Sequence, residues 1–222
     1  MIVTRLINTD FTPLYPDSPV SSALAKMDAW QSSSIPVIDP ATMKLKGHVL
    51  FEDLASEPDE SLPVSDVLIR KPVFSYTNQH IFEVVRQMLR HEVRILAVVD
   101  HNQMYLGVAE KKSVLEALSE MLNISTRGSV ITVQMNRADY KLSELAHLIE
   151  SENAKILGLT VAQASENEVD LLISIKLNCE DTSAITSSLR RYGYLVSTEN
   201  KTDLMQLDLS SRADELMRYL DL

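Results

Sequence analysis

The chain has 222 residues and a formal net charge of −10, and its 45% hydrophobic and 23% charged residues are ordinary for a soluble globular protein. Acidic residues outnumber basic ones by 31 to 21 and are spread along the chain. DNA or RNA would therefore be repelled on average, and we expect no nucleic-acid partner.

Three further features indicate where the protein acts. No apolar stretch reaches the roughly 18 residues that span a bilayer, so we expect no membrane partner. The first residues lack the pattern of a secretion signal. The single cysteine, Cys179, excludes an internal disulfide framework and fits a reducing compartment. We therefore expect a cytoplasmic location.

A repeat organises the first half of the chain. A shift of 61 residues lays 3–7 (VTRLI) on 64–68 (VSDVL), and with one residue fewer Gly47 falls on Gly107. In each copy the pattern predicts an extended apolar segment, a helix, a short strand, a turn, a second strand carrying the glycine, and a second helix. One copy is too small to bury its own sheet face, so we expect the two copies to pack sheet against sheet.

Apolar spacing locates the helices and strands of each copy. Apolar residues recur at three-and-four spacing from Val20 to Trp30, which predicts a helix, and the same spacing begins again at Ile81. Uninterrupted apolar runs at 35–38 and 95–99 predict short buried strands.

The strand and glycine phrases of the repeat resemble the signature of CBS domains. They are IPVID at 35–39 and GHVLFEDL at 47–54, then LAVVD at 96–100 and GVA at 107–109. The resemblance implies two repeats that form a disc-like Bateman module with a central cleft. It implies no obligatory cofactor, but a regulatory ligand in the cleft: AMP, ADP, ATP or another adenosyl compound.

A different pattern begins at Gly128. The order strand, helix, strand, strand, helix, strand is a ferredoxin-like plan. The phrases GSVITV and LSELAHLI resemble ACT domains, which commonly bind amino acids at dimer interfaces. The predicted strands are 129–135, 154–161, 169–177 and 194–197, and the predicted helices are 142–149 and 183–191.

The overall fold class is therefore α/β (α+β), a CBS-domain pair followed by a βαββαβ ACT-like domain, a combination that resembles the acetoin-utilisation regulator family. We assign residues 1–60 and 61–122 to the two CBS repeats, 128–203 to the ACT-like domain and 204–222 to a C-terminal helix. That last segment carries an apolar stripe without a basic face, so we expect it to pack on protein rather than on a membrane.

Catalytic motifs are absent from the sequence. The five histidines show neither HxxxH nor HxH spacing, and no GxSxG, GxxxxGK[ST] or GxGxxG occurs. We therefore expect no enzyme activity and no metal site, and interpret the chain as a non-catalytic regulatory protein.

The resemblance implies at most one ligand site. In ligand-binding CBS repeats, a Gly-apolar-x-(Ser/Thr)-x-x-Asp stretch places a hydroxyl and a carboxylate at a helix N-terminus, and the carboxylate accepts hydrogen bonds from the ribose. Copy one keeps the acid, Asp53, but has Leu50 at the hydroxyl position. Copy two has Glu110 and Ser113 at these two positions.

The implied site lies at the cleft between the copies. Asp53 would bind the ribose, Arg94 would supply a charge to the phosphate, and apolar residues would enclose the base. The implied binding residues are Val49, Leu50, Asp53, Ile69, Val73, Val93 and Arg94.

Two function classes remain open. The retained Asp53 and Arg94 favour a sensor that binds an adenosyl ligand and transmits its state to the ACT-like domain or to a partner. Leu50, Glu110 and Ser113 favour a dimerising interaction module with degenerate sites that acts on an unidentified regulated protein.

Amino-acid binding at the ACT-like domain is a further alternative. The loop at 136–141 lacks the glycine that usually lets backbone amides meet a ligand carboxylate, which argues against it. We also expect a homodimer, because the apolar run at 171–173 and the C-terminal stripe offer surface that one chain does not cover, and both families usually self-associate.

Overall fold

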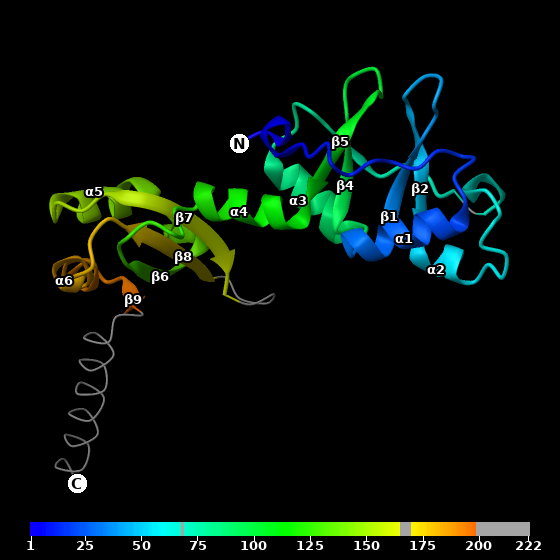
Figure 1. Cartoon of the computed structure of the whole chain (residues 1–222). Coiled ribbons are helices and arrows are strands. Elements are labelled where there is room, and N and C mark those ends of the chain that lie inside the picture. The colour runs from blue at the N-terminus through cyan, green and yellow to red at the C-terminus, as the bar shows by residue number, and fades with distance from the viewer. Residues whose placement is uncertain (68, 165–169, 199–222) are drawn as a thin grey trace, which may run out of the picture. The chain divides into compact units, whose positions relative to one another are not determined.

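The computed structural model describes residues 1–67, 69–164 and 170–198, and the chain divides into two compact units, Met1–Leu118 and Ser119–Leu222 (Figure 1). Helices and strands alternate in both units, so the predicted α+β fold class is confirmed. The predicted C-terminal helix lies outside the described residues, and the predicted domain boundaries stay predictions.

Unit 1 contains the repeat. Its first copy consists of η1 (Val3–Leu6), α1 (Val20–Trp30), β1 (Ser34–Ile38), β2 (Leu45–Leu50) and α2 (Phe51–Ala55). Its second copy consists of η2 (Val64–Asp66), β3 (Phe74–Tyr76), α3 (Ile81–Arg90), β4 (Ile95–Val99), β5 (Tyr105–Glu110) and α4 (Lys111–Met121), which continues past the division between the units.

The two copies repeat residue by residue. Both first helices bury three apolar side chains at equivalent positions. In the β1–β2 hairpin Ile35 pairs with Val49, and the equivalent Leu96 pairs with Ala109 in β4–β5. A register irregularity follows at the same place in both hairpins. The predicted repeat is therefore confirmed, as are the helices and strands that it located.

The leading segments of the copies differ from the prediction of extended structure. Val3–Leu6 and Val64–Asp66 are 3₁₀ helices, and the extended prediction is wrong at these residues. In each segment only the first valine is buried. A single turn of 3₁₀ helix is enough to bury that one side chain, so the segment needs no pairing with a strand.

Backbone hydrogen bonds join the two copies. Asn8, ahead of the helix of copy one, exchanges two backbone hydrogen bonds with Val108 of β5, at 2.8 and 3.0 Å. Arg70, ahead of β3, exchanges two with His48 of β2, at 2.9 and 3.2 Å. These reciprocal antiparallel bridges tie the two copies into one unit.

Unit 2 is a four-stranded antiparallel sheet with strand order β7-β8-β6-β9. Its elements are β6 (Val130–Asn136), η3 (Arg137–Asp139), α5 (Leu142–Ser151), β7 (Ile156–Gln163), β8 (Asp170–Leu177), α6 (Ser183–Arg191) and β9 (Leu195–Thr198). The helices share one buried core with the alternate residues of β6 and β8. The βαββαβ plan is thus confirmed.

None of the helices in the described part of the chain has the length and apolar character of a bilayer span.

Candidate functional site

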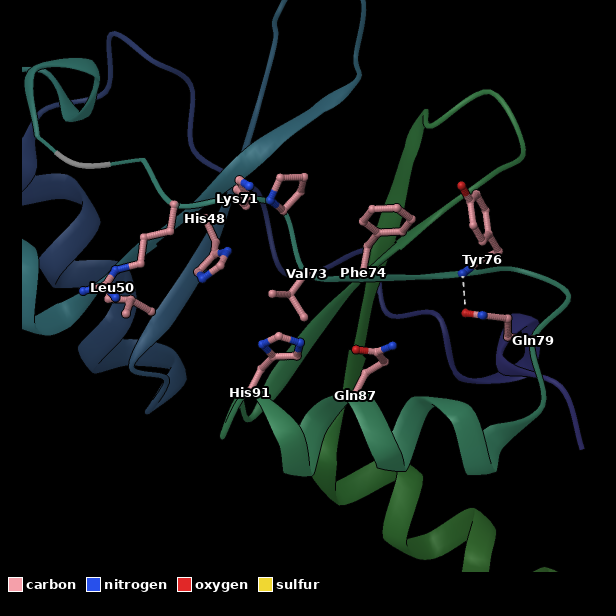
Figure 2. A pocket seen from close by; sticks show the side chains of 11 residues that line it. His48, Leu50, Lys71, Val73, Phe74, Tyr76, Gln79, Gln87 and His91 are labelled. Atoms are coloured by element: carbon pink, nitrogen blue, oxygen red, sulfur yellow. Dashed lines mark hydrogen bonds between the residues drawn. The ribbon is translucent and has the colours of Figure 1, made fainter.

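A pocket of about 600 Å³ opens in unit 1 where the stretch of copy two just ahead of β3 crosses β2 (Figure 2). It is bounded by β2 of copy one, by residues 70–76 and by the helix α3. The lining residues are His48, Leu50, Arg70, Lys71, Pro72, Val73, Phe74, Tyr76, Gln79, Gln87 and His91.

Local periodicity brings these side chains together. His48 and Leu50 are two residues apart on β2 and so point to the same face of the strand. Gln87 and His91 are four residues apart at the C-terminal end of α3 and share one face of the helix. Figure 2 shows His91, at the end of α3, pointing toward Val73, and Gln87 of α3 pointing toward Phe74.

The lining of the pocket contains basic but no acidic residues. Arg70 and Lys71 are cationic, and His48 and His91 bring imidazole nitrogens. Arg70 is paired with carboxylates that lie outside the lining, whereas Lys71 has no carboxylate partner among the described residues. Lys71 and the unpaired N–H groups of Arg70 are therefore the lining groups that can attract an anion.

Arg70 is held at the pocket by two carboxylates of α2. Its Nε donates to Asp53 Oδ2 at 2.8 Å and its Nη2 donates to Asp53 Oδ1 at 2.9 Å, a bidentate pair. Nη2 also donates to Glu52 Oε1 at 2.9 Å. The hydrogen bonds from Arg70 hold the pKa of the Asp53 carboxyl below its usual value, so Asp53 stays ionised.

His48 is a partly buried titratable group of the pocket. Burial is the largest effect and lowers the pKa of its imidazole; a hydrogen bond with the Lys71 backbone opposes it, and the charges of Arg70 and His91 lower the pKa further. Its buried Nδ1 has no hydrogen-bond partner among the described residues. The ring is therefore neutral at pH 7 in the free protein.

The opposite end of the pocket is aromatic. The rings of Phe74 and Tyr76 meet edge to face with centroids 5.3 Å apart. Gln79 Oε1 accepts from the backbone N–H of Tyr76 at 2.9 Å and from Ser75 Oγ at 2.7 Å, which fixes the amide group (Figure 2). The pocket thus has two aromatic rings at one end and Arg70 and Lys71 at the other.

The predicted site residues divide between the pocket and the core. Leu50 and Val73 line the pocket. Asp53 lies behind Arg70 and is not a lining residue. Val49 and Val93 are buried, and Ile69 packs against the core of copy one.

Arg94 is the predicted residue that lies apart. It is exposed, its Nη1 donates to the backbone carbonyl of Gln31 at 2.9 Å, and it does not line the pocket. Sequence reasoning missed the cationic and aromatic lining residues. A usable signal was available, because Arg70 and Lys71 directly precede a proline in the segment that crosses β2. The missed lining residues are His48, Arg70, Lys71, Pro72, Phe74, Tyr76, Gln79, Gln87 and His91.

The equivalent cleft on the other side of the repeat holds bulkier side chains. Trp30 stands where copy two has His91, and its ring meets that of Phe11 edge to face at 4.8 Å. Lys26 stands where copy two has Gln87, and its Nζ donates to the carbonyls of Thr12 and Pro13, both at 3.1 Å. Trp30 and Lys26 thus both contact the segment 11–13 that precedes the first helix.

A second hollow, of about 480 Å³, lies in unit 2 beside the end of β6. Three carboxylates line it, those of Asp139, Glu144 and Asp170, against one lysine, Lys141. Gln134 Nε2 donates to Asp170 at 3.0 Å. The three carboxylates of this lining would repel the carboxylate of a free amino acid.

Comparison with known proteins identifies the fold of the pocket region. A family profile described as CBS domain matches residues 64–120. The chain contains a CBS domain. All the lining residues of the first pocket except His48 and Leu50 belong to this CBS domain.

Solved structures with CBS domains resemble the chain over about half its length. One is a CBS domain pair/ACT domain protein from Thermotoga maritima, 26% identical with a TM-score of 0.51, over 55% of this chain and 99% of that one. Another is the CBS domains of a transcriptional regulator from Streptococcus pneumoniae, 24% identical with a TM-score of 0.47, over 52% of this chain and 98% of that one.

A curated relative is the inosine-5'-monophosphate dehydrogenase of Methanocaldococcus jannaschii, 25% identical over 112 residues. The alignment covers 50% of this chain but 22% of the dehydrogenase. The chain therefore spans about a fifth of the length of that relative. Among the described residues, no group of three or more histidine, cysteine or acidic side chains is placed to hold a metal ion.

Proposed function

We propose that the protein is a non-catalytic cytoplasmic sensor that binds an adenine nucleotide or related adenosyl ligand in the unit 1 pocket. The ligand's state would be transmitted to unit 2 or to a regulated partner protein. The observation that carries this proposal is the pocket itself, which has an aromatic wall at one end and Arg70 and Lys71 at the other.

The dimensions and chemistry of the pocket fit such a ligand. Its volume of about 600 Å³ falls in the range of small-molecule sites. A purine base packs well against an aromatic ring, such as that of Phe74 or Tyr76, and a phosphate needs cations, which Arg70 and Lys71 offer. We expect one ligand per chain, because bulkier side chains, Trp30 and Lys26, stand in the equivalent cleft where this pocket has His91 and Gln87.

The assignment of unit 2 as an ACT-like domain is part of the proposal. Its ferredoxin-like strand order supports it, and the Thermotoga maritima protein that resembles 55% of the chain is described as a CBS domain pair/ACT domain protein. The acidic hollow beside β6 disfavours amino-acid binding there, so we assign unit 2 to signal transmission. The chain's likeness to the acetoin-utilisation regulator family belongs to the same proposal.

Calorimetry of the full chain with AMP, ADP, ATP, NAD and S-adenosylmethionine tests the ligand. We expect at least one of them to bind with one site per chain. Replacing Lys71 with alanine should weaken a phosphate-bearing ligand roughly 10- to 100-fold, the effect of losing a charge-assisted hydrogen bond. The charge-matched control is Lys112→Ala, on exposed α4, which should leave affinity unchanged. Absence of binding at millimolar concentration would leave the interaction-module alternative.

We also propose that the protein is a homodimer. Large apolar side chains stay exposed on the helices of unit 1, with Phe82, Leu89 and Leu115 exposed by 56, 64 and 67%. Exposed large apolar side chains of this kind are available for self-association. Light scattering at micromolar concentration should give twice the mass of one chain, 24.9 kDa, and a monomeric mass would contradict the proposal.

A further inference from the structure

We propose that Arg70 is the residue that binds the phosphate of the ligand, and that Asp53 is a positioning residue for Arg70 rather than the acceptor of the ribose hydroxyls. This inference rests on the proposed function, because it assigns roles within the same pocket. It departs from the roles that the sequence resemblance implies for Asp53 and Arg94.

The first argument is the hydrogen-bonding capacity of the Arg70 guanidinium. A guanidinium carries five N–H donors. Three of them, on Nε and Nη2, are used by Asp53 and Glu52. Nη1 makes no hydrogen bond within the described residues, so its two N–H groups remain available to a ligand in the pocket that Arg70 lines. A phosphate oxygen is the natural acceptor for them.

The second argument is the state of the Asp53 carboxylate. Each of its oxygens accepts from Arg70, at 2.8 and 2.9 Å, and the side chain is only 17% exposed. A ribose would have to displace this bidentate ion pair to reach the carboxylate. Asp53 is also absent from the lining of the pocket, whereas Arg70 is part of it. The carboxylate is therefore placed to orient Arg70.

The third argument is that the main chain of Arg70 is fixed as well. Its N–H donates to the His48 carbonyl at 2.9 Å and its carbonyl accepts from the His48 N–H at 3.2 Å. With the backbone held by β2 and the guanidinium held by α2, little rotamer freedom is left to lose when an anion binds. Such preorganisation strengthens binding.

The pseudo-equivalent position in copy one gives an internal comparison. There Asn8 takes the place of Arg70, and its Nδ2 donates to Glu110 Oε1 at 2.7 Å. A neutral amide beside an acid offers no anion site. Arg94 offers none at the pocket either, because its Nη1 is engaged with Gln31.

The test separates the phosphate from the ribose by changing both protein and ligand. Calorimetry would use the full chain and its Arg70→Gln, Arg70→Lys, Asp53→Asn and Arg94→Gln variants, each checked for an unchanged melting temperature. The probes are AMP, 2′,3′-dideoxy-AMP, adenosine and inorganic pyrophosphate. We expect Arg70→Gln to weaken AMP and pyrophosphate by about tenfold or more and to leave adenosine unchanged. Arg70→Lys should fall between, since it keeps the charge but loses the fork.

Asp53 is tested by the pattern of its losses. A positioning role predicts that Asp53→Asn weakens AMP and dideoxy-AMP by the same factor, about three- to tenfold, without affecting adenosine. Adding Asp53→Asn to Arg70→Gln should cause no further loss, because the two residues act as one unit. Arg94→Gln is the charge-matched control and should change nothing.

Several results would overturn the inference. One is a loss on Asp53→Asn that is equal for AMP and adenosine and vanishes for dideoxy-AMP, which would make Asp53 the ribose acceptor. Another is an Arg94→Gln loss equal to that of Arg70→Gln. If pyrophosphate binds in an Arg70-dependent way and no nucleotide does, the proposed function fails and the anion site stands. If neither binds, both fail.

Discussion

Replacing Gly47 with alanine is expected to destabilise unit 1 by about 3 kcal/mol, at the upper end of the cost of overpacking. A Cβ at this position would lie 2.2 Å from the Arg70 carbonyl oxygen and 2.7 Å from Ile69 Cγ2. The obstacle is a backbone carbonyl in the β2 bridge, which a rotamer change cannot move. The leading segment of copy two would have to shift, and Arg70 with it, so we also expect nucleotide affinity to fall.

Urea unfolding and amide hydrogen exchange of unit 1 measure this effect. The control is Gly193→Ala in unit 2, where φ is +86° but nothing lies within 4 Å of the added Cβ. There the cost is backbone strain alone, about 1–2 kcal/mol. If Gly47→Ala costs less than Gly193→Ala, the close crossing of the leading segment over β2 is not a firm constraint.

The sequence predicts the regular elements of unit 1 well because the repeat presents each burial pattern twice. The helix at Val20–Trp30 has the predicted bounds, and β1 and β4 fall within a residue of the predicted strands. The leading segments are mispredicted because η1 and η2 each have a single buried anchor. An apolar run in these segments therefore indicates one buried side chain rather than a strand.

Unit 2 follows the same logic. Burial alternates completely in β8, which lies between two strands and has one buried face. The sequence follows this alternation except at Leu172, an apolar residue on the less buried face, so its pattern predicts the strand. The edge strand β7 has no buried residue and ends at Gln163, two residues beyond the prediction. An edge strand is defined by its pairing, and pairing leaves a weaker mark on composition than burial does.

The pocket was harder to predict for a definite physical reason. Aligning one copy on the other reveals which positions are equivalent. The residues that line the pocket, however, come from positions of the two copies that are not equivalent to one another. Arg70 meets Asp53 and His48 only because the leading segment of copy two crosses to β2 of copy one. The same holds for Trp30 and Lys26 in the equivalent cleft. In the sequence they are ordinary helix residues, and their contacts across the cleft appear only in the folded chain.

Replacing Ile173 with alanine is expected to destabilise unit 2 by about 2–5 kcal/mol, the usual cost of emptying a fully buried position. Ile173 is 0% exposed on β8, and it pairs with Val133 of β6 and Val161 of β7. Because β8 is bonded on both sides, the neighbouring strands cannot close readily around the missing atoms. Amide exchange of β6 and β8 should accelerate accordingly.

Leu172→Ala is the matched control for Ile173→Ala, because the two positions are adjacent on β8 and face opposite sides of the sheet. Leu172 is only partly buried, so its truncation should cost about 1 kcal/mol. Exchange must be compared unit by unit, because a chain of two compact units need not unfold in one step. Protection in unit 1 should be unchanged by either substitution, since the site lies outside its core. Equal losses at 172 and 173 would mean that the helices α5 and α6 do not cover the face of the sheet assigned to them, and with that the ferredoxin-like packing of unit 2 would fail.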